Sequence, residues 1–263
     1  MSDQKELVIS SGDQLLQPTT RRKFLGVMGM GGAIVFLPAV FAACNDDNNG
    51  TGIVGGGTAA QFTLNLNDDT GILNYAYALE QLEAAYYTAA LGSPGFSALS
   101  ANDQEVLSDL QKHEVIHREF FKTVLGSAAL PTIVFNSTTV GSLTATKDVL
   151  LKTSQLLEDT GVSAYNGAGK YLKSKDNLLV AGKIVSVEAR HAAAIRDIRD
   201  GANGRLFAGD DVVDKTSGLD VKAEPGAVLT AVGGLNVLVS PLTKGTDPDA
   251  SKKTADAPAP SPV

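Results

Sequence analysis

Four segments of the chain place apolar residues at alternating steps of three and four, which is the spacing of one face of an α-helix. They predict helices over about 69–91, 100–126, 145–173 and 175–200. The turn between the first two is short, so these helices are expected to be antiparallel neighbours. The connector over 127–144 is rich in Thr, Ser, Val and Ile, lacks a helical period and is long for a compact domain.

Each apolar face is interrupted by one glutamate at a position where a core residue is expected. Two of these glutamates begin a Glu-x-x-His motif. Because residues i and i+3 share a helix face, each motif directs a carboxylate and an imidazole to one point. Burial of four carboxylates is costly unless positive charge compensates, and two divalent cations would cancel their charge. The pattern therefore predicts a dinuclear metal site between four helices, with the ligands Glu80, Glu114, His117, Glu158, Glu188 and His191.

The two halves of the helical region repeat one spacing. Glu80 is followed seven residues later by Tyr87, and Glu158 is followed seven residues later by Tyr165. Each pair precedes a Glu-x-x-His motif by about thirty residues. The repeat predicts two helical hairpins that bracket two metals symmetrically. The tyrosines are candidate redox-active or hydrogen-bonding residues near the metals, or else core aromatic residues with a satisfied hydroxyl.

The stretches Ile72–Tyr87, His113–Phe121 and Val187–Ile195 resemble the ferritin-like superfamily of di-iron and di-manganese carboxylate proteins. In particular, they resemble the bacterial and plant members grouped with desiccation-related proteins. The resemblance implies an all-α fold, an antiparallel four-helix bundle with one long crossover between helices two and three. It also implies a centre of two iron or manganese ions held by the six ligands, with Glu114 and Glu188 able to bridge.

Two details of the predicted site remain open in the sequence. Glu83 lies one turn from Glu80 and is an alternative ligand on the first helix, although the Glu–Tyr spacing favours Glu80. The third helix carries Gly161, Gly167 and Gly169, and each glycine costs about 1 kcal/mol in a helix relative to alanine. We expect that they allow a close backbone approach to another helix or a local distortion at the site.

His113 to His117 also match the zinc-protease motif, in which two histidines at i and i+4 bind zinc and the glutamate between them is a base. Such a site needs a third ligand, which Glu158, Glu188 or His191 could supply. This alternative leaves the second Glu-x-x-His motif and the repeat unexplained. In the di-metal interpretation, His113 lies beside the site or on the surface.

The N-terminal residues 1–44 have the features of an export signal. Arg21 and Arg22 precede an apolar run over 25–43, as in twin-arginine signals, so the export machinery for folded proteins is a predicted partner. Cys44, the only cysteine, follows a lipobox-like sequence and is a candidate lipidation and cleavage site. Cleavage without lipidation and an uncleaved anchor are the alternatives. The protein is expected to be periplasmic, tethered to a membrane only by this segment, or secreted.

The rest of the chain is divided by composition. Residues 45–64 read as a flexible linker, 65–204 as the bundle, 205–243 as a C-terminal cap or short fifth helix packed on the bundle, and 244–263 as a disordered tail. The formal charge is −7, from 22 basic and 29 acidic residues, which argues against nucleic acid as a partner. No feature of the sequence supports an oligomer.

Carboxylate-rich di-iron sites react with oxygen or peroxide, and di-manganese sites dismutate peroxide. The sequence therefore predicts an exported oxidoreductase of the ferroxidase, peroxidase or catalase-like type that acts in stress protection. A protein that binds metal or protects against desiccation without turnover is the alternative, and a zinc hydrolase is a minor one.

Overall fold

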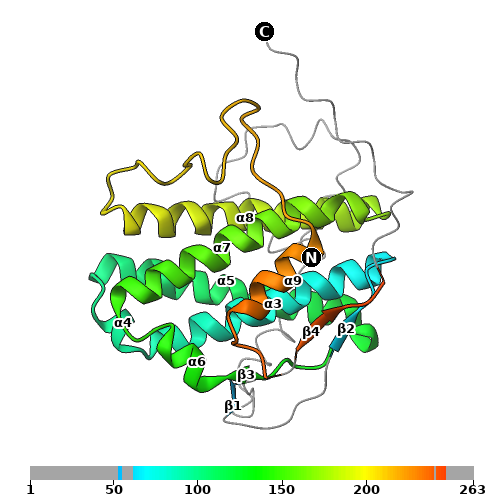
Figure 1. Ribbon diagram of the computed structural model, residues 1–263, viewed down its shortest axis with the longest axis horizontal. Helices are drawn as coiled ribbons and strands as arrows, with labels where there is room; N and C mark the ends of the chain where they lie inside the picture. The colour runs from blue at the N-terminus through cyan, green and yellow to red at the C-terminus, as the bar shows by residue number, and fades with distance from the viewer. Residues whose placement is uncertain (1–52, 55–61, 240, 247–263) are drawn as a thin grey trace, which may run out of the picture. The chain divides into compact units, whose positions relative to one another are not determined.

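The computed structural model describes residues 53–54, 62–239 and 241–246. The predicted signal, Cys44 and most of the predicted tail lie outside these residues. The described part contains four long helices (Figure 1). They are α3 (Asp69–Leu91), α5 (Ala101–Leu125), α7 (Lys147–Ala168) and α8 (Lys175–Arg199). No helix among the described residues is long and apolar enough to cross a membrane.

Each long helix begins at a side-chain cap. Asp68, Ser100, Thr146 and Ser174 each accept a hydrogen bond from the backbone N–H three residues further on. Such a cap stabilises a helix by about 0.5–2 kcal/mol, because it satisfies a donor that the helix leaves without a partner. The observed starts lie within two residues of the predicted ones, since capping is a local property of the sequence.

The helices pack as two hairpins, α3 with α5 and α7 with α8. A long crossover joins the hairpins and contains η3 (Gly126–Ala128), β3 (Phe135–Asn136) and α6 (Ser137–Ser142). The arrangement confirms the predicted all-α bundle with one long crossover. The crossover was expected to lack a helical period, but it contains the short helix α6. The side chain of Asn136 caps this helix. A helix of six residues is too short to show a period in the sequence.

Helix α3 is buried on almost every side, with all residues from Asn74 to Tyr87 in the interior. The crossover covers one flank, where Asn74 and Gln81 accept hydrogen bonds from the backbone N–H groups of Leu130 and Ile133 at 2.7 and 2.8 Å. The helix α9 (Pro225–Gly234) packs on α7 and contributes to the same hydrophobic core as α3. The C-terminal segment thus contributes apolar residues to the core of the bundle.

One residue expected on an apolar helix face is exposed instead. The steps of three and four along α5 also place Val124 in the core, but its side chain is 51% exposed. The buried residue is Leu125. Leu125 follows Phe121 by four residues and Val124 follows it by three. Because an α-helix has 3.6 residues per turn, the step of four stays closer to the face of Phe121.

Two short parallel strand pairs join distant parts of the chain. β1 (Ile53–Val54) pairs with β3, and β2 (Phe62–Leu64) pairs with β4 (Leu242–Lys244). The predicted linker over 45–64 and the predicted tail from 244 therefore each include residues of a strand. Their boundaries were misplaced because strand pairing across 180 residues leaves no local signal in the sequence.

Gly167 shows why α7 tolerates glycine. A Cβ atom at this position would lie 1.8 Å from the carbonyl oxygen of Ala223. The backbone N–H of Ala223 also donates a 2.9 Å hydrogen bond to the carbonyl of Ser163 on α7. The expected close backbone approach is present, but the partner is the C-terminal segment and not another helix.

Candidate metal centre

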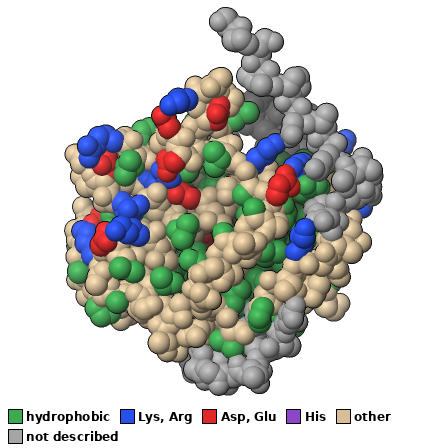
Figure 2. Space-filling model, in the orientation of Figure 1, with side chains coloured by type: hydrophobic (Ala, Val, Ile, Leu, Met, Phe, Trp, Pro, Cys, Tyr) green, Lys and Arg blue, Asp and Glu red, His purple; other side chains and the backbone are tan. Residues whose placement is uncertain are grey.

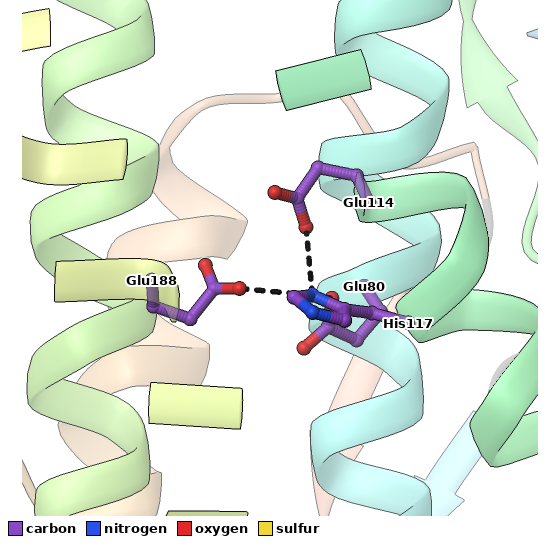
Figure 3. Close-up of side chains that lie close together, drawn as sticks. All are labelled: Glu80, Glu114, His117 and Glu188. Carbon is purple, nitrogen blue, oxygen red and sulfur yellow. Dashed lines mark ion pairs between the residues drawn. The ribbon is translucent and has the colours of Figure 1, made fainter. Parts of the chain in front are cut away.

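The six predicted ligands come together in the middle of the bundle. Glu80 lies on α3, Glu114 and His117 on α5, Glu158 on α7, and Glu188 and His191 on α8. The four carboxylates have no exposed surface, and the two imidazoles are almost fully buried. Figure 3 shows four of these side chains pointing toward one another from three helices. On the face drawn in Figure 2, no histidine side chain can be seen.

The donor atoms form two overlapping groups. Glu80, Glu114, His117 and Glu188 make one group, and Glu114, Glu158, Glu188 and His191 make the other. Within each group, one donor atom from every residue lies within 4.8 Å of all the others. Glu114 and Glu188 belong to both groups, so they occupy the positions from which a carboxylate can bridge two metal ions.

Both imidazoles turn Nδ1 toward the carboxylates. His117 Nδ1 lies 2.9 Å from Glu188 Oε1 and 3.3 Å from Glu80 Oε2. His191 Nδ1 lies 2.8 Å from Glu114 Oε1 and 3.4 Å from Glu158 Oε2. The same nitrogen of each ring therefore faces its donor group, as the symmetry of the repeat predicts.

The donor atoms fit a bound cation. Both oxygens of Glu114 and of Glu188, one oxygen each of Glu80 and Glu158, and both Nδ1 atoms are buried without a hydrogen bond among the described residues. A buried polar atom without a partner costs about 1–3 kcal/mol, and charged ones cost more. Eight such atoms converging on two points would be satisfied by two metal ions.

Two tyrosines donate hydrogen bonds to carboxylate oxygens that are not directed at the donor groups. Tyr87 donates a 2.6 Å hydrogen bond to Glu158 Oε1, and Tyr165 donates one to Glu80 Oε1. Each of these glutamates thus uses one oxygen for a tyrosine and directs the other to its donor group. Burial raises the pKa of both tyrosines well above its usual value, so both hydroxyls stay protonated and remain donors.

In the absence of metal, burial and the neighbouring donors shift the pKa values of His117, His191 and Glu80. Burial lowers the pKa of His117, but the carboxylates of Glu114, Glu188 and Glu80 close to its Nδ1 outweigh burial and raise the pKa to about 12. For His191, the pair with Glu114 outweighs burial in the same way and raises the pKa to about 10. Burial raises the pKa of Glu80 to about 7. The directions of these shifts show that the surrounding carboxylates favour positive charge at both imidazole positions.

Glu83 is a fifth buried carboxylate at the edge of the site. It belongs to neither donor group, and Glu80 occupies the position of the first-helix donor. Burial, together with the charge of Glu188, raises the pKa of Glu83 well above its usual value. Gly161 leaves room for it, because a Cβ there would lie 3.1 Å from Glu83 Oε1 and 3.5 Å from Glu188 Oε2.

His113 lies outside both donor groups on the exposed edge of α5. Its Nδ1 is 3.0 Å from His191 Nε2, and the two rings stack with centroids 5.2 Å apart. His113 thus contacts the ring nitrogen of His191 that faces away from the site. His113 and His117, the two histidines of the zinc-protease motif, therefore do not belong to a common donor group. The second Glu-x-x-His motif, which the zinc interpretation leaves unexplained, points the same way.

Comparison with protein families gives a match over the helical part of the chain. A family model described as a ferritin-like domain matches residues 68–200, the range from the cap of α3 to the end of α8. All six donor residues lie inside the matched range. A search of curated proteins gives no match.

Proposed function

The chain belongs to the ferritin-like domain family, and on this premise we propose that it binds two iron or manganese ions and carries out redox chemistry with dioxygen or peroxide. The observation that carries the proposal is the pair of overlapping donor groups that share Glu114 and Glu188. Four carboxylates balance two divalent cations in an interior where unbalanced charge is costly.

The types of donor atom favour iron and manganese. Each group offers three carboxylates and one imidazole, and no thiolate is among them. Carboxylates suit manganese, imidazole suits iron as well as zinc, copper and nickel, and thiolate ligands favour zinc and copper(I). A set with three carboxylates for each imidazole is therefore compatible with manganese and iron. Two iron ions bound here would supply two electrons, enough to convert peroxide and two protons into two waters, or dioxygen and two protons into hydrogen peroxide.

The protein residues around the donors hold their geometry and keep water out. Tyr87 and Tyr165 fix the orientation of Glu158 and Glu80 through hydrogen bonds. His113 contacts His191 at Nε2, which leaves Nδ1 directed at the carboxylates. Partners of this outer kind typically change metal affinity by about 10–100-fold.

Metal analysis of the purified chain tests the proposal. After loading with iron or manganese, we expect about two ions per chain, in keeping with the dinuclear sites of four-helix bundles. Absorption spectra recorded during addition of peroxide should change as the ions are oxidised. One zinc ion per chain with no iron or manganese would contradict the proposal and support the zinc hydrolase. Two bound ions without any reaction would support the alternative of a non-catalytic metal-binding protein.

We also propose that the protein is exported after it has folded and bound metal. Arg21 and Arg22 match a signal for the export of folded proteins, and the donors come from four helices, so the site forms only in the folded chain. Replacement of both arginines by lysine should leave a folded, metal-bearing precursor inside the cell. Normal export of that variant, measured by cell fractionation, would show that the twin-arginine interpretation is wrong.

A further inference from the structure

An apolar cavity lies inside the bundle beside the candidate metal centre, and all four long helices contribute to its wall. The volume open to the centre of a water-sized sphere is about 20 Å³. Because the centre of such a sphere can move within this volume, the cavity can hold at least one molecule of that size. The cavity therefore has room for one very small molecule.

The wall of the cavity includes half-buried residues and a residue that contacts a candidate ligand. Leu73, Leu172 and Ala181 on its wall are half-buried, whereas Leu79 and Tyr165 are buried. Tyr165 is the residue whose hydroxyl binds Glu80 in the first donor group. The side chain of Tyr165 thus contacts both the cavity and a candidate ligand.

The surface of the cavity consists of carbon atoms alone, because its walls are aliphatic and aromatic groups and no polar atom is exposed to it. A molecule of hydrogen peroxide would lose its hydrogen bonds with water there and gain none in return, which is unfavourable. An apolar molecule loses nothing on entry, and cavities of this kind stay dry and bind apolar ligands such as xenon.

We propose that this cavity is the entry and holding site for dioxygen, and that dioxygen is the oxidant which the protein admits by this route. The inference rests on the proposed function and specifies its co-substrate. His113, on the exposed edge of α5, contacts His191 of the second donor group and does not line the cavity. Because hydrogen peroxide is disfavoured in the apolar cavity, the two oxidants are expected to respond differently when the cavity is closed.

Xenon tests the cavity without any metal. In the full, metal-free chain, xenon added under pressure should occupy the cavity, seen as shifts of the Leu79 and Ala164 methyl signals in NMR spectra. Ala181→Phe places a large side chain at the half-buried rim and should abolish these shifts. Ala89→Phe is the matched control, because Ala89 is also half-buried on a long helix but does not line the cavity. If Ala181→Phe does not fold, Ala181→Leu closes the rim with a smaller side chain.

Oxidation kinetics then test the role of dioxygen. In the iron-loaded chain, Ala181→Phe should slow oxidation by dioxygen several-fold and leave oxidation by peroxide unchanged, while Ala89→Phe should change neither. Absence of xenon from the wild-type cavity, or an equal effect of the rim variant on both oxidants, would overturn the inference. If the wild-type chain binds no iron or manganese, the proposed function itself is wrong and the dioxygen role fails with it. If it binds metal and the rim variant has no effect, only the route is wrong.

Discussion

Gly161 on α7 faces the carboxylate of Glu83 on α3 across the edge of the candidate metal centre. A Cβ atom at Gly161 would approach Glu83 Oε1 to 3.1 Å, which is closer than side chains normally pack. The glycine thus makes room for a carboxylate that belongs to neither donor group. The free-energy cost of a glycine in α7 and the position of the Glu83 side chain therefore depend on the same contact.

This contact predicts a coupling between the two residues. Alanine is better than glycine in a helix by about 1 kcal/mol, so Gly161→Ala should stabilise the metal-free chain in a Glu83→Ala background. In the wild-type background the clash should cancel much of this gain. Urea unfolding of the four proteins of the double-mutant cycle measures the difference. The same effect of Gly161→Ala in both backgrounds would show that the contact is unimportant.

The two neighbouring histidines on α5 should behave differently. His117→Ala removes a donor of the first group and should abolish binding of one metal ion. His113→Ala removes only a contact with His191 Nε2, so the chain should still bind two ions, with an affinity weakened by at most about 10–100-fold. Metal titration with calorimetry measures both quantities. Equal loss of metal in the two variants would instead point to the zinc-type pair.

The tyrosine hydroxyls that bind the outer glutamates should affect metal binding. Tyr165→Phe leaves Glu80 Oε1 without its donor, which should destabilise the metal-free chain by about 1–3 kcal/mol and weaken metal binding. Tyr86→Phe is the control, since the Tyr86 hydroxyl is also buried but donates to the carbonyl of Leu150, at 2.8 Å. It should lower stability without a change in metal affinity. If metal affinity falls equally in both variants, the Tyr165 hydroxyl has no specific role.

The C-terminal segment should loosen from the bundle in acid. The buried Arg196 donates hydrogen bonds to Asp211 at 2.7 and 3.0 Å, and these lower the pKa of Asp211 below its usual value. A lowered pKa in the folded state stabilises the protein at pH values above about 4, and this contribution is lost as the pH falls through the folded pKa. Because Asp211 is largely exposed, we expect at most about 1 kcal/mol.

The difference in unfolding free energy between the wild type and Asp211→Asn measures this contribution. It should be constant near neutral pH and shrink toward zero as the pH falls below 4. Amide hydrogen exchange of Val212 and Val221, whose backbone groups are joined by a 2.8 Å hydrogen bond, should report the same change locally. A difference that does not depend on pH would show that the pair with Arg196 contributes nothing.

The sequence by itself determined the helices and the residues that supply the donors. Helix starts depend on a capping residue and the N–H groups three residues away, and the apolar faces depend on steps of three and four, so both are local. The same periodicity placed Glu80, Glu114, Glu158 and Glu188 on the inner faces. The Glu-x-x-His spacing then aligned His117 and His191 with two of them. The structure brings these six side chains together, and their metal remains a prediction.

Only the tertiary structure decided which groups meet across the bundle. The stacking of His113 on His191, the space that Gly161 leaves for Glu83, and the approach of Ala223 to Gly167 each join residues that are far apart in the chain. The pairing of β2 with β4 and the apolar cavity beside Tyr165 are of the same kind. Periodicity shows which side of a helix faces inward, but rotation, height and backbone distance between helices are set by the packing of all side chains together.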